Sequence, residues 1–250
     1  MKKILSLLLI FSVLCFFTLT SEAKTKKKKK PQIKHKIEFV TKDKFILVGD
    51  LYLANQEYSD KPLVVALHSF GLNSLAWEKL ALDLRVKDYN VLAMDLRGHG
   101  RSVYNEKLKI KSRYKFTKDD WAKLPDDVIE LINYVKKNYP KINTKDIIFL
   151  GADIGASAGV IAGGSLKQEP KKFVMVSPMF DFKGLHIPIK IANYKTTRFL
   201  VILSKSDKIY FNFHTKDAPK IIQYSKGGPG NQLLKVNPQS KNDIINFIIN

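Results

Sequence analysis

Residues 146–159, DIIFLGADIGASAG, constrain the fold more than any other part of the chain. Ile147–Leu150 is a short run of mostly β-branched and aromatic residues, which predicts a buried strand. Gly151 and Gly155 then let the chain turn sharply, and the small residues that follow suit the tightly packed start of a helix. The sequence therefore predicts a strand, a tight turn and a helix, with Asp153 at the top of the turn.

The composition indicates one globular domain behind a processing signal. The chain has 250 residues, of which 45% are hydrophobic and 26% charged, enough for a single well-formed core. Lys2 and Lys3 precede the apolar run Ile4–Leu19, and Ser21-Glu22-Ala23 supplies small residues for a cleavage site. We expect residues 1–23 to be a signal peptide cleaved near Ala23, giving an exported protein, periplasmic or secreted.

A lipid anchor is the alternative reading of this segment, because Cys15 lies inside the apolar run. Leu14, directly before it, is too large for a good lipobox. Cys15 is also the only cysteine, so a chain cleaved near Ala23 has no disulfides, no thiol catalysis and no cysteine metal ligands.

The chain is strongly basic, with a formal net charge of +20. Lys24 and Lys26–Lys30 form a basic tail within residues 24–36, which read as a linker. Such a tail either adheres to an anionic envelope surface or simply keeps the linker soluble. Aromatic residues are not interleaved with the lysines, so we expect no nucleic-acid partner.

Downstream of the linker, strand and helix patterns alternate. The runs Ile37–Val40 and Phe45–Leu53 flank a polar turn and predict a β-hairpin. Apolar runs predict further buried strands at Pro62–Leu67 and Asn90–Leu96. We also expect strands at Phe173–Val176 and Phe199–Leu203, and a last short strand at Ile221–Tyr224. Helical spacing predicts helices at Ala76–Val86, Lys118–Asn138, Ser157–Leu166 and Asp243–Ile249. This alternation predicts an α/β fold with a mostly parallel central sheet, helices on both faces, an N-terminal β-hairpin and no lid domain.

Several short motifs occur in an order that resembles the α/β-hydrolase superfamily. They are LHSFG, DLRGHGRS at Asp95–Ser102, GADIG, SPMFDFKG and LSKSD. The resemblance covers residues 37–250, which we take as the α/β-hydrolase domain. It is similar to small, lidless bacterial members of the esterase or dienelactone-hydrolase type.

This resemblance implies roles for particular residues. In such enzymes the turn is the nucleophile elbow and carries a serine, but here Asp153 occupies that position. The triad acid maps to Asp207. The two backbone N–H groups that hold the oxyanion would be those of Phe70 and Ile154. Phe70 lies in the loop His68–Gly71, which we call the oxyanion loop. His68 and Ser69 belong to this loop, where Ser69 replaces the usual glycine, and we count both among the binding residues.

The catalytic histidine is missing. Relatives carry a pattern close to G-x-G-H-G after the last strand, whereas this chain has Gly227-Gly228-Pro229-Gly230-Asn231, and we place Pro229, or Gly228 with a one-residue gap, at the histidine position. His68 and His99 lie in superfamily loops and are expected to be structural. Asp153 and Asp207 together also suggest a cation site or an acid–base pair, but no His or Glu stands at metal-ligand spacing. We expect no metal and no cofactor.

Two main hypotheses follow. The first is a catalytically degenerate hydrolase fold that binds a small molecule in the elbow pocket, with the Asp153 carboxylate filling the oxyanion hole; replacing Asp153 by Asn would then cost stability. The second is an active hydrolase with Asp153 as the nucleophile, acting on an ester, a haloalkane or an epoxide. A third role, as a surface or scaffold protein, would depend on the Lys24–Lys30 tail instead of the pocket.

Overall fold

The computed structural model describes residues 33–56, 59–207 and 212–250. The predicted signal peptide, Cys15 and the Lys24–Lys30 tail lie outside these residues. Within the described ranges, no helix is long and apolar enough to cross a membrane.

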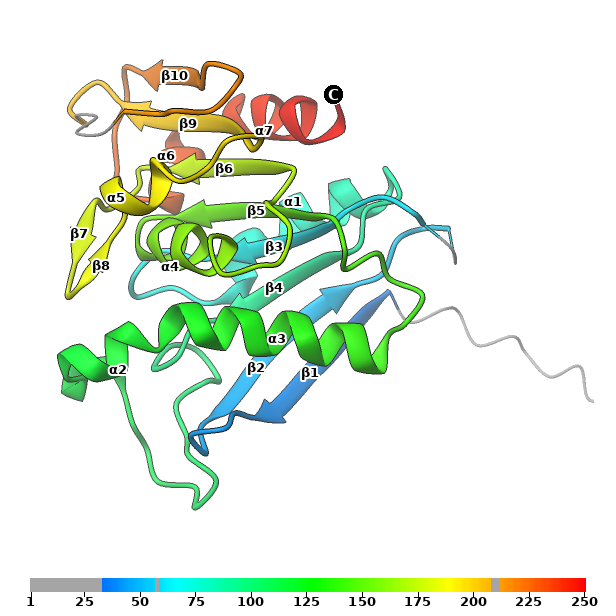
Figure 1. The fold of residues 1–250 in the computed structure, drawn as a ribbon, viewed down its shortest axis with the longest axis vertical. Helices are drawn as coiled ribbons and strands as arrows, with labels where there is room; N and C mark the ends of the chain where they lie inside the picture. Colours follow the sequence, from blue (N-terminus) through cyan, green and yellow to red (C-terminus); the bar gives the residue numbers. More distant parts are fainter. Residues whose placement is uncertain (1–32, 57–58, 208–211) are drawn as a thin grey trace, which may run out of the picture. The chain divides into compact units, whose positions relative to one another are not determined.

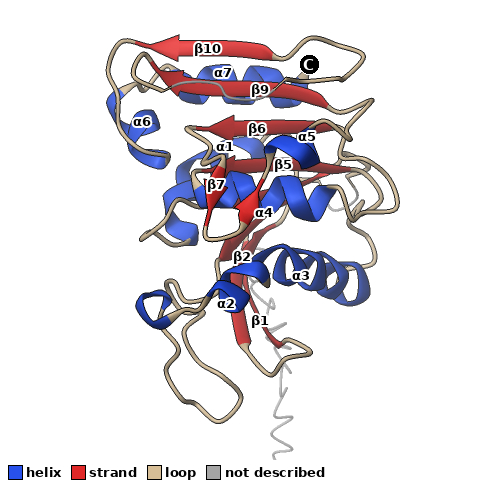
Figure 2. Ribbon diagram, turned by 60° about the vertical axis from the view of Figure 1, so that its left-hand side comes forward, coloured by secondary structure: helices blue, strands red, loops and turns tan. Residues whose placement is uncertain are grey.

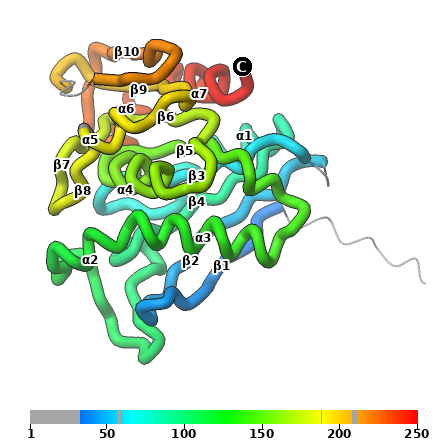
Figure 3. Tube along the Cα trace, viewed as in Figure 1, coloured from blue at the N-terminus to red at the C-terminus, as the bar shows by residue number. Residues whose placement is uncertain are grey.

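An eight-stranded sheet forms the centre of the described domain, in the order β1-β2-β4-β3-β5-β6-β9-β10. The strands β1 and β2 form an antiparallel hairpin at one edge, and β10 forms the other edge (Figure 3). The pair β2–β4 is also antiparallel, whereas all neighbours from β4 to β10 are parallel. The strands are β1 (Lys34–Val40), β2 (Ile46–Tyr52), β3 (Leu63–Leu67), β4 (Val91–Asp95), β5 (Ile147–Ala152), β6 (Lys172–Val176), β9 (Arg198–Ser204) and β10 (Lys220–Tyr224).

Helices cover both faces of this sheet, with α3 and α4 on one face and α1, α6 and α7 on the other (Figures 1 and 2). The helices are η1 (Ser74–Trp77), α1 (Glu78–Arg85), η2 (Arg113–Lys115), α2 (Lys118–Ala122), α3 (Leu124–Asn138), α4 (Ile154–Gly163), α5 (Pro188–Ile191), α6 (Asn231–Val236) and α7 (Ser240–Ile249). In β3, Leu63, Val65 and Leu67 pack into the core beneath α3 and α4, while Val64 and Ala66 pack into the core on the opposite face. Both faces of β3 are therefore buried, which is why its sequence is continuously apolar. The predicted fold class is confirmed.

One predicted helix is divided. Residues 118–138 were expected to be continuous, but α2 ends at Ala122 and α3 starts at Leu124. Pro125 stands in the first turn of α3 and has no N–H, so it cannot donate to the Trp121 carbonyl, and the helical hydrogen-bond pattern is interrupted between α2 and α3. Thr117 and Asp120 form a capping box that starts α2 separately.

Other differences lie at short elements and boundaries. Strand β1 begins at Lys34, inside the predicted linker, because the Lys34 ammonium lies 2.9 Å from Glu78 Oε1 and its backbone is in register with Tyr52. Between β6 and β9 the described chain forms only the hairpin β7 (Asp181–Phe182) and β8 (Leu185–His186) with α5, and no lid domain. The sequence patterns did not indicate these elements or α6, because each is too short to show a periodicity.

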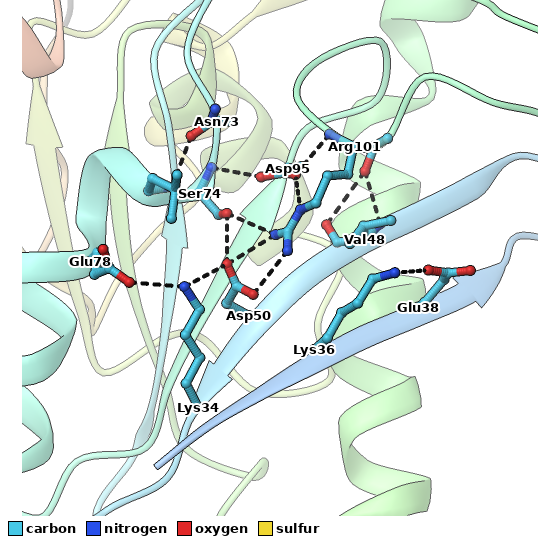
Figure 4. A network of polar contacts seen from close by, with 12 residues as sticks. Lys34, Lys36, Glu38, Val48, Asp50, Asn73, Ser74, Glu78, Asp95 and Arg101 are labelled. Atoms are coloured by element: carbon cyan, nitrogen blue, oxygen red, sulfur yellow. Dashed lines mark hydrogen bonds and ion pairs between the residues drawn. The ribbon is translucent and has the colours of Figure 1, made fainter. Parts of the chain in front are cut away.

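A buried polar network holds the start of η1 against the sheet (Figure 4). The Asp95 carboxylate accepts hydrogen bonds from Ser74 N (2.7 Å), Arg101 N (3.0 Å) and Arg101 Nε (2.8 Å). Arg101 also donates to both oxygens of Asp50, at 3.1 and 3.0 Å. Both carboxylates are 1% exposed. Because Ser74 follows the oxyanion loop directly, this network fixes the far end of that loop.

We expect Asp95→Ala to lower the free energy of unfolding by about 3 kcal/mol, because it leaves buried donors without their acceptor. Glu38→Ala is the matched control: Glu38 pairs with Lys36 on the surface, and its loss should cost less than about 1 kcal/mol. Urea unfolding followed by circular dichroism measures both. Equal effects of the two substitutions would contradict the anchoring role.

Candidate active site

The tight turn between β5 and α4 has the predicted form. Asp153 stands at its apex with φ 55° and ψ −122°, a strained conformation for a residue with a side chain. A Cβ atom on Gly155 would lie 2.4 Å from the Leu67 carbonyl oxygen, and one on Gly151 would lie 2.5 Å from Ala156 Cα. Glycine is therefore required at both positions, and the turn packs directly onto the end of β3.

The Asp153 side chain lies in the predicted oxyanion hole. Phe70 N donates to Asp153 Oδ2 at 3.0 Å, and the neighbouring Ile154 N–H lowers the pKa of this carboxylate. Asp153 is 8% exposed and precedes the N-terminus of α4, whose dipole favours negative charge. One of the two backbone donors expected to hold an oxyanion, Phe70 N, is thus hydrogen-bonded to the side chain of the elbow residue.

Burial raises the pKa of Asp153 to about 6, and the Phe70 and Ile154 N–H donors offset part of that rise. Desolvation penalises the charged carboxylate more than the two hydrogen bonds stabilise it. The group is therefore ionised at neutral pH and becomes protonated in mildly acidic solution.

The loop after β10 closes one side of the elbow. A Cβ atom on Gly230 would lie 2.9 Å from Asp153 Cβ and 1.9 Å from Ser69 Oγ. Asn231 Oδ1 accepts from Ser69 N (3.0 Å) and Ser69 Oγ (2.8 Å), and Asn231 N donates back to Ser69 Oγ (2.7 Å). Among the described residues, the buried Asn231 Nδ2 has no hydrogen-bond partner.

These contacts change the expected position of the lost histidine. Pro229 is exposed, whereas Asn231 is buried against Ser69. The G-x-G-H pattern also fits Gly228-Pro229-Gly230-Asn231 without a gap, and this register puts Asn231 at the histidine position. The signal was present in the sequence, but the histidine position was taken as Pro229, or Gly228 with a one-residue gap. Asn231 and Gly230 are the site residues that the sequence reading missed.

Asp207 follows β9, as expected, and its carboxylate is held at the strand ends. Its Oδ2 accepts from Ser177 Oγ at 3.0 Å and from Ser204 N at 2.9 Å. These two hydrogen bonds fix the orientation of the Asp207 carboxylate, and neither of them comes from a histidine. Within the described chain, no group of three or more His, Cys, Asp or Glu side chains is placed to hold a metal ion.

His68 and His99 are buried inside the loops that shape the site. His68 Nε2 accepts from Leu96 N (3.0 Å) and its Nδ1 lies 2.7 Å from the Ser69 carbonyl oxygen, so the ring is neutral and both nitrogens are engaged. Burial lowers the pKa of His68 to about 4 and that of His99 to about 3. His68 therefore holds the oxyanion loop in place. We had expected His68 to be a binding residue, but its side chain is fully buried and cannot contact a ligand directly.

Aromatic side chains adjoin the oxyanion loop. The half-exposed Phe70 ring lies 5.8 Å from Phe182 and 6.0 Å from Trp121, and the Arg113 guanidinium lies 5.4 Å from its centre. We call Phe70, Trp121 and Phe182 the aromatic wall. Because Phe70 N also donates to Asp153, the aromatic wall adjoins the buried carboxylate through Phe70.

We predict that Asp153 makes folding stability fall as pH rises through about 4 to 6, because the folded protein retains a proton there that the unfolded chain has released. Asp153→Asn removes this contribution, so the variant should gain stability relative to the wild type across that window. Any stability cost of Asp153→Asn, as expected from the sequence, should therefore become smaller as pH rises through this window. Urea unfolding of both proteins at several pH values measures the difference, and a difference that does not vary with pH would contradict the raised pKa.

Comparison with known proteins agrees with this geometry. The family model described as "Serine aminopeptidase, S33" matches residues 58–226. A monoglyceride lipase homolog of monkeypox virus is 27% identical over 121 residues, covering 48% of this chain and 40% of that protein. The monoglyceride lipase of Rattus norvegicus is 24% identical over 119 residues, covering 48% and 35%. The matches thus span less than half the length of these curated relatives.

Similarity to solved structures extends further along the chain. An esterase from Pyrococcus furiosus superposes with a TM-score of 0.62 at 18% identity, covering 86% of this chain and 89% of that one. At this identity the likeness concerns the fold. Together with the family match over more than half of the sequence, it establishes that the chain belongs to the serine aminopeptidase S33 family of α/β hydrolases.

Proposed function

We propose that this protein is a catalytically degenerate α/β hydrolase that binds a small molecule at the elbow and does not turn it over. The observation that carries the proposal is the hydrogen bond from the Phe70 N–H group to the Asp153 carboxylate, at 3.0 Å. In a serine hydrolase, groups of this kind stabilise the negative oxygen that forms during acyl transfer. Here the Phe70 N–H group already binds the negative charge of the Asp153 carboxylate.

An ester carbonyl entering this site meets two obstacles. It must displace the Asp153 carboxylate to reach the Phe70 N–H donor, and the tetrahedral oxyanion would then form beside a second negative charge. Like charges at contact distance in a dry site are strongly unfavourable. The arrangement therefore disfavours the transition state that an oxyanion hole normally stabilises.

The site also lacks a general base. An asparagine amide does not take up a proton at neutral pH, and Asn231 is hydrogen-bonded to Ser69. The depressed pKa values of His68 and His99 reflect burial, and the nitrogens of His68 are already engaged. Without a base, neither a serine-type nor an aspartate-type cycle is completed.

The aspartate nucleophile is the alternative, and the intact elbow favours it. Asp153 keeps the strained apex conformation that presents a nucleophile, with φ 55°. Attack of its carboxylate on a haloalkane or epoxide carbon would form an alkyl ester, which needs an activated water for release. Without that water the reaction would stop after one turnover, leaving a mass adduct.

For the ligand we propose a neutral acylglycerol or related ester, because the curated relatives are named monoglyceride lipases. The aromatic wall offers an apolar contact for such a molecule, and the ionised Asp153 disfavours a free fatty acid. We keep export through residues 1–23 and surface adhesion through Lys24–Lys30 as part of this proposal.

We expect the wild type and Asp153→Asn to show the same background rates on an aryl butyrate, monobutyrin, a haloalkane and an epoxide. Neither protein should gain mass. Asp181→Asn, at an exposed aspartate of β7, is the matched control. Turnover or an adduct that is present in the wild type and Asp181→Asn, but absent in Asp153→Asn, would establish the nucleophile and overturn the degenerate assignment.

Binding without turnover gives a second expectation. Calorimetric titration with monobutyrin should be saturable, and Phe182→Ala, which removes part of the aromatic wall, should weaken the affinity about tenfold. Phe213→Ala is the matched control, because Phe213 packs on Phe199 under the sheet, 4.9 Å between ring centres. Equal affinities in the two variants would place the ligand elsewhere.

A further inference from the structure

The segment between β4 and α2 forms a hairpin-shaped loop, residues 103–115, which we call the basic loop. Tyr104 pairs with Ile110 in an antiparallel bridge, and Lys111 N donates to Val103 O at 2.7 Å. In Figures 1 and 2 the loop extends from the domain as a long excursion, and in Figure 1 its end lies beyond the turn between β1 and β2.

Hydrogen bonds fix the shape of its tip. Asn105 Oδ1 accepts from Lys107 N (3.0 Å) and Lys109 N (2.9 Å), and Asn105 O accepts from Leu108 N (2.8 Å). The base is tied to the hairpin through Ile46 N, which donates to Tyr104 O at 2.8 Å. The loop therefore presents its side chains in a defined arrangement.

Large apolar side chains point out of this loop. Leu108 is 71% exposed, Ile110 67% and Tyr114 76%. Leu108 also has a φ of 55°, a conformation that a solvent-facing turn would normally give to Gly or Asn. Single exposed apolar residues are ordinary, but this many within one short loop mark an interaction surface.

Cationic side chains surround these apolar groups. Lys107 and Lys109 flank Leu108 and are exposed, and Lys115 at the end of the loop is exposed as well. The Arg113 guanidinium stacks on Tyr114, 4.4 Å from its ring centre. The acidic groups that face the loop are already paired, Glu106 with Lys44 at 3.3 Å and Asp120 with Lys111.

We propose that the basic loop docks the protein on an anionic lipid surface. Leu108 and Ile110 enter the boundary between headgroups and acyl chains, while the lysine ammonium groups remain at the level of the lipid phosphates. Tyr114 suits the same interfacial depth, because its ring is apolar and its hydroxyl polar. Alternating lysine and aliphatic side chains fit this partner better than a nucleic acid, which would leave Leu108 and Ile110 in water. The exposed tip, residues 107–110, is not part of the elbow; Arg113 near the loop's other end contacts Phe70, but the proposal does not depend on the proposed function.

The test is Leu108→Trp in the full chain, mixed with vesicles of phosphatidylcholine containing phosphatidylglycerol. The native Trp77 and Trp121 are 1% and 3% exposed, so they contribute little signal change. We expect a blue shift of the emission and quenching by lipids brominated on the acyl chain. Sedimentation without quenching at this position would assign binding to the Lys24–Lys30 tail and overturn the proposal.

Two sets of variants separate the contribution of the apolar side chains from that of the lysines. The double variant Leu108→Ser/Ile110→Ser should weaken vesicle partitioning about tenfold or more. The double variant Lys107→Gln/Lys109→Gln should weaken it about tenfold at low salt. The controls are Val86→Ser, 58% exposed on another surface, and Lys136→Gln with Lys137→Gln on α3; both should partition like the wild type. Partitioning that is unchanged in the loop variants, or equal on vesicles without phosphatidylglycerol, would overturn the proposal.

Discussion

The hydrogen bond from the Phe70 N–H to the Asp153 carboxylate joins two loops that lie far apart in the sequence, the oxyanion loop after β3 and the elbow after β5. Their approach depends on Gly155, which packs against the Leu67 and His68 carbonyls, and on the neutral His68 ring, which holds the loop to Leu96. Asp95 fixes the other end of the same loop through Ser74. These contacts combine close packing of the backbone with hydrogen bonds from buried side chains. They hold the strained elbow turn so that its apex carboxylate meets the Phe70 N–H.

The sequence predicted what depends on local pattern. Continuous apolar runs located the buried strands, and glycine spacing located the elbow with Asp153 at its apex. It did not predict the division of the 118–138 helix, where a single proline outweighs a regular apolar stripe. Asn231 was missed because the glycine-rich segment allows more than one motif register, and its contact with Ser69, 162 residues away, is what distinguishes them. The raised pKa of Asp153 could not be predicted from sequence patterns either, because it reflects a balance between burial and two backbone N–H groups.

Two surfaces of this domain thus have chemistry suited to contact. The elbow combines an anionic carboxylate with an aromatic wall, whereas the basic loop combines lysines with exposed aliphatic side chains. They carry opposite charge and lie on different segments. Binding a small neutral ester at the first and an anionic lipid surface at the second would place the protein where acylglycerols occur, with no need for turnover.

The amide proton shifts of Phe70 and Ile154, followed by NMR against pH, test the central claim most directly. If the Asp153 carboxylate occupies the oxyanion hole, both amides report the same titration with a midpoint near pH 6, and Asp153→Asn abolishes it. Amide shifts that do not change with pH, or a titration that survives in Asp153→Asn, would show that the carboxylate does not occupy the hole.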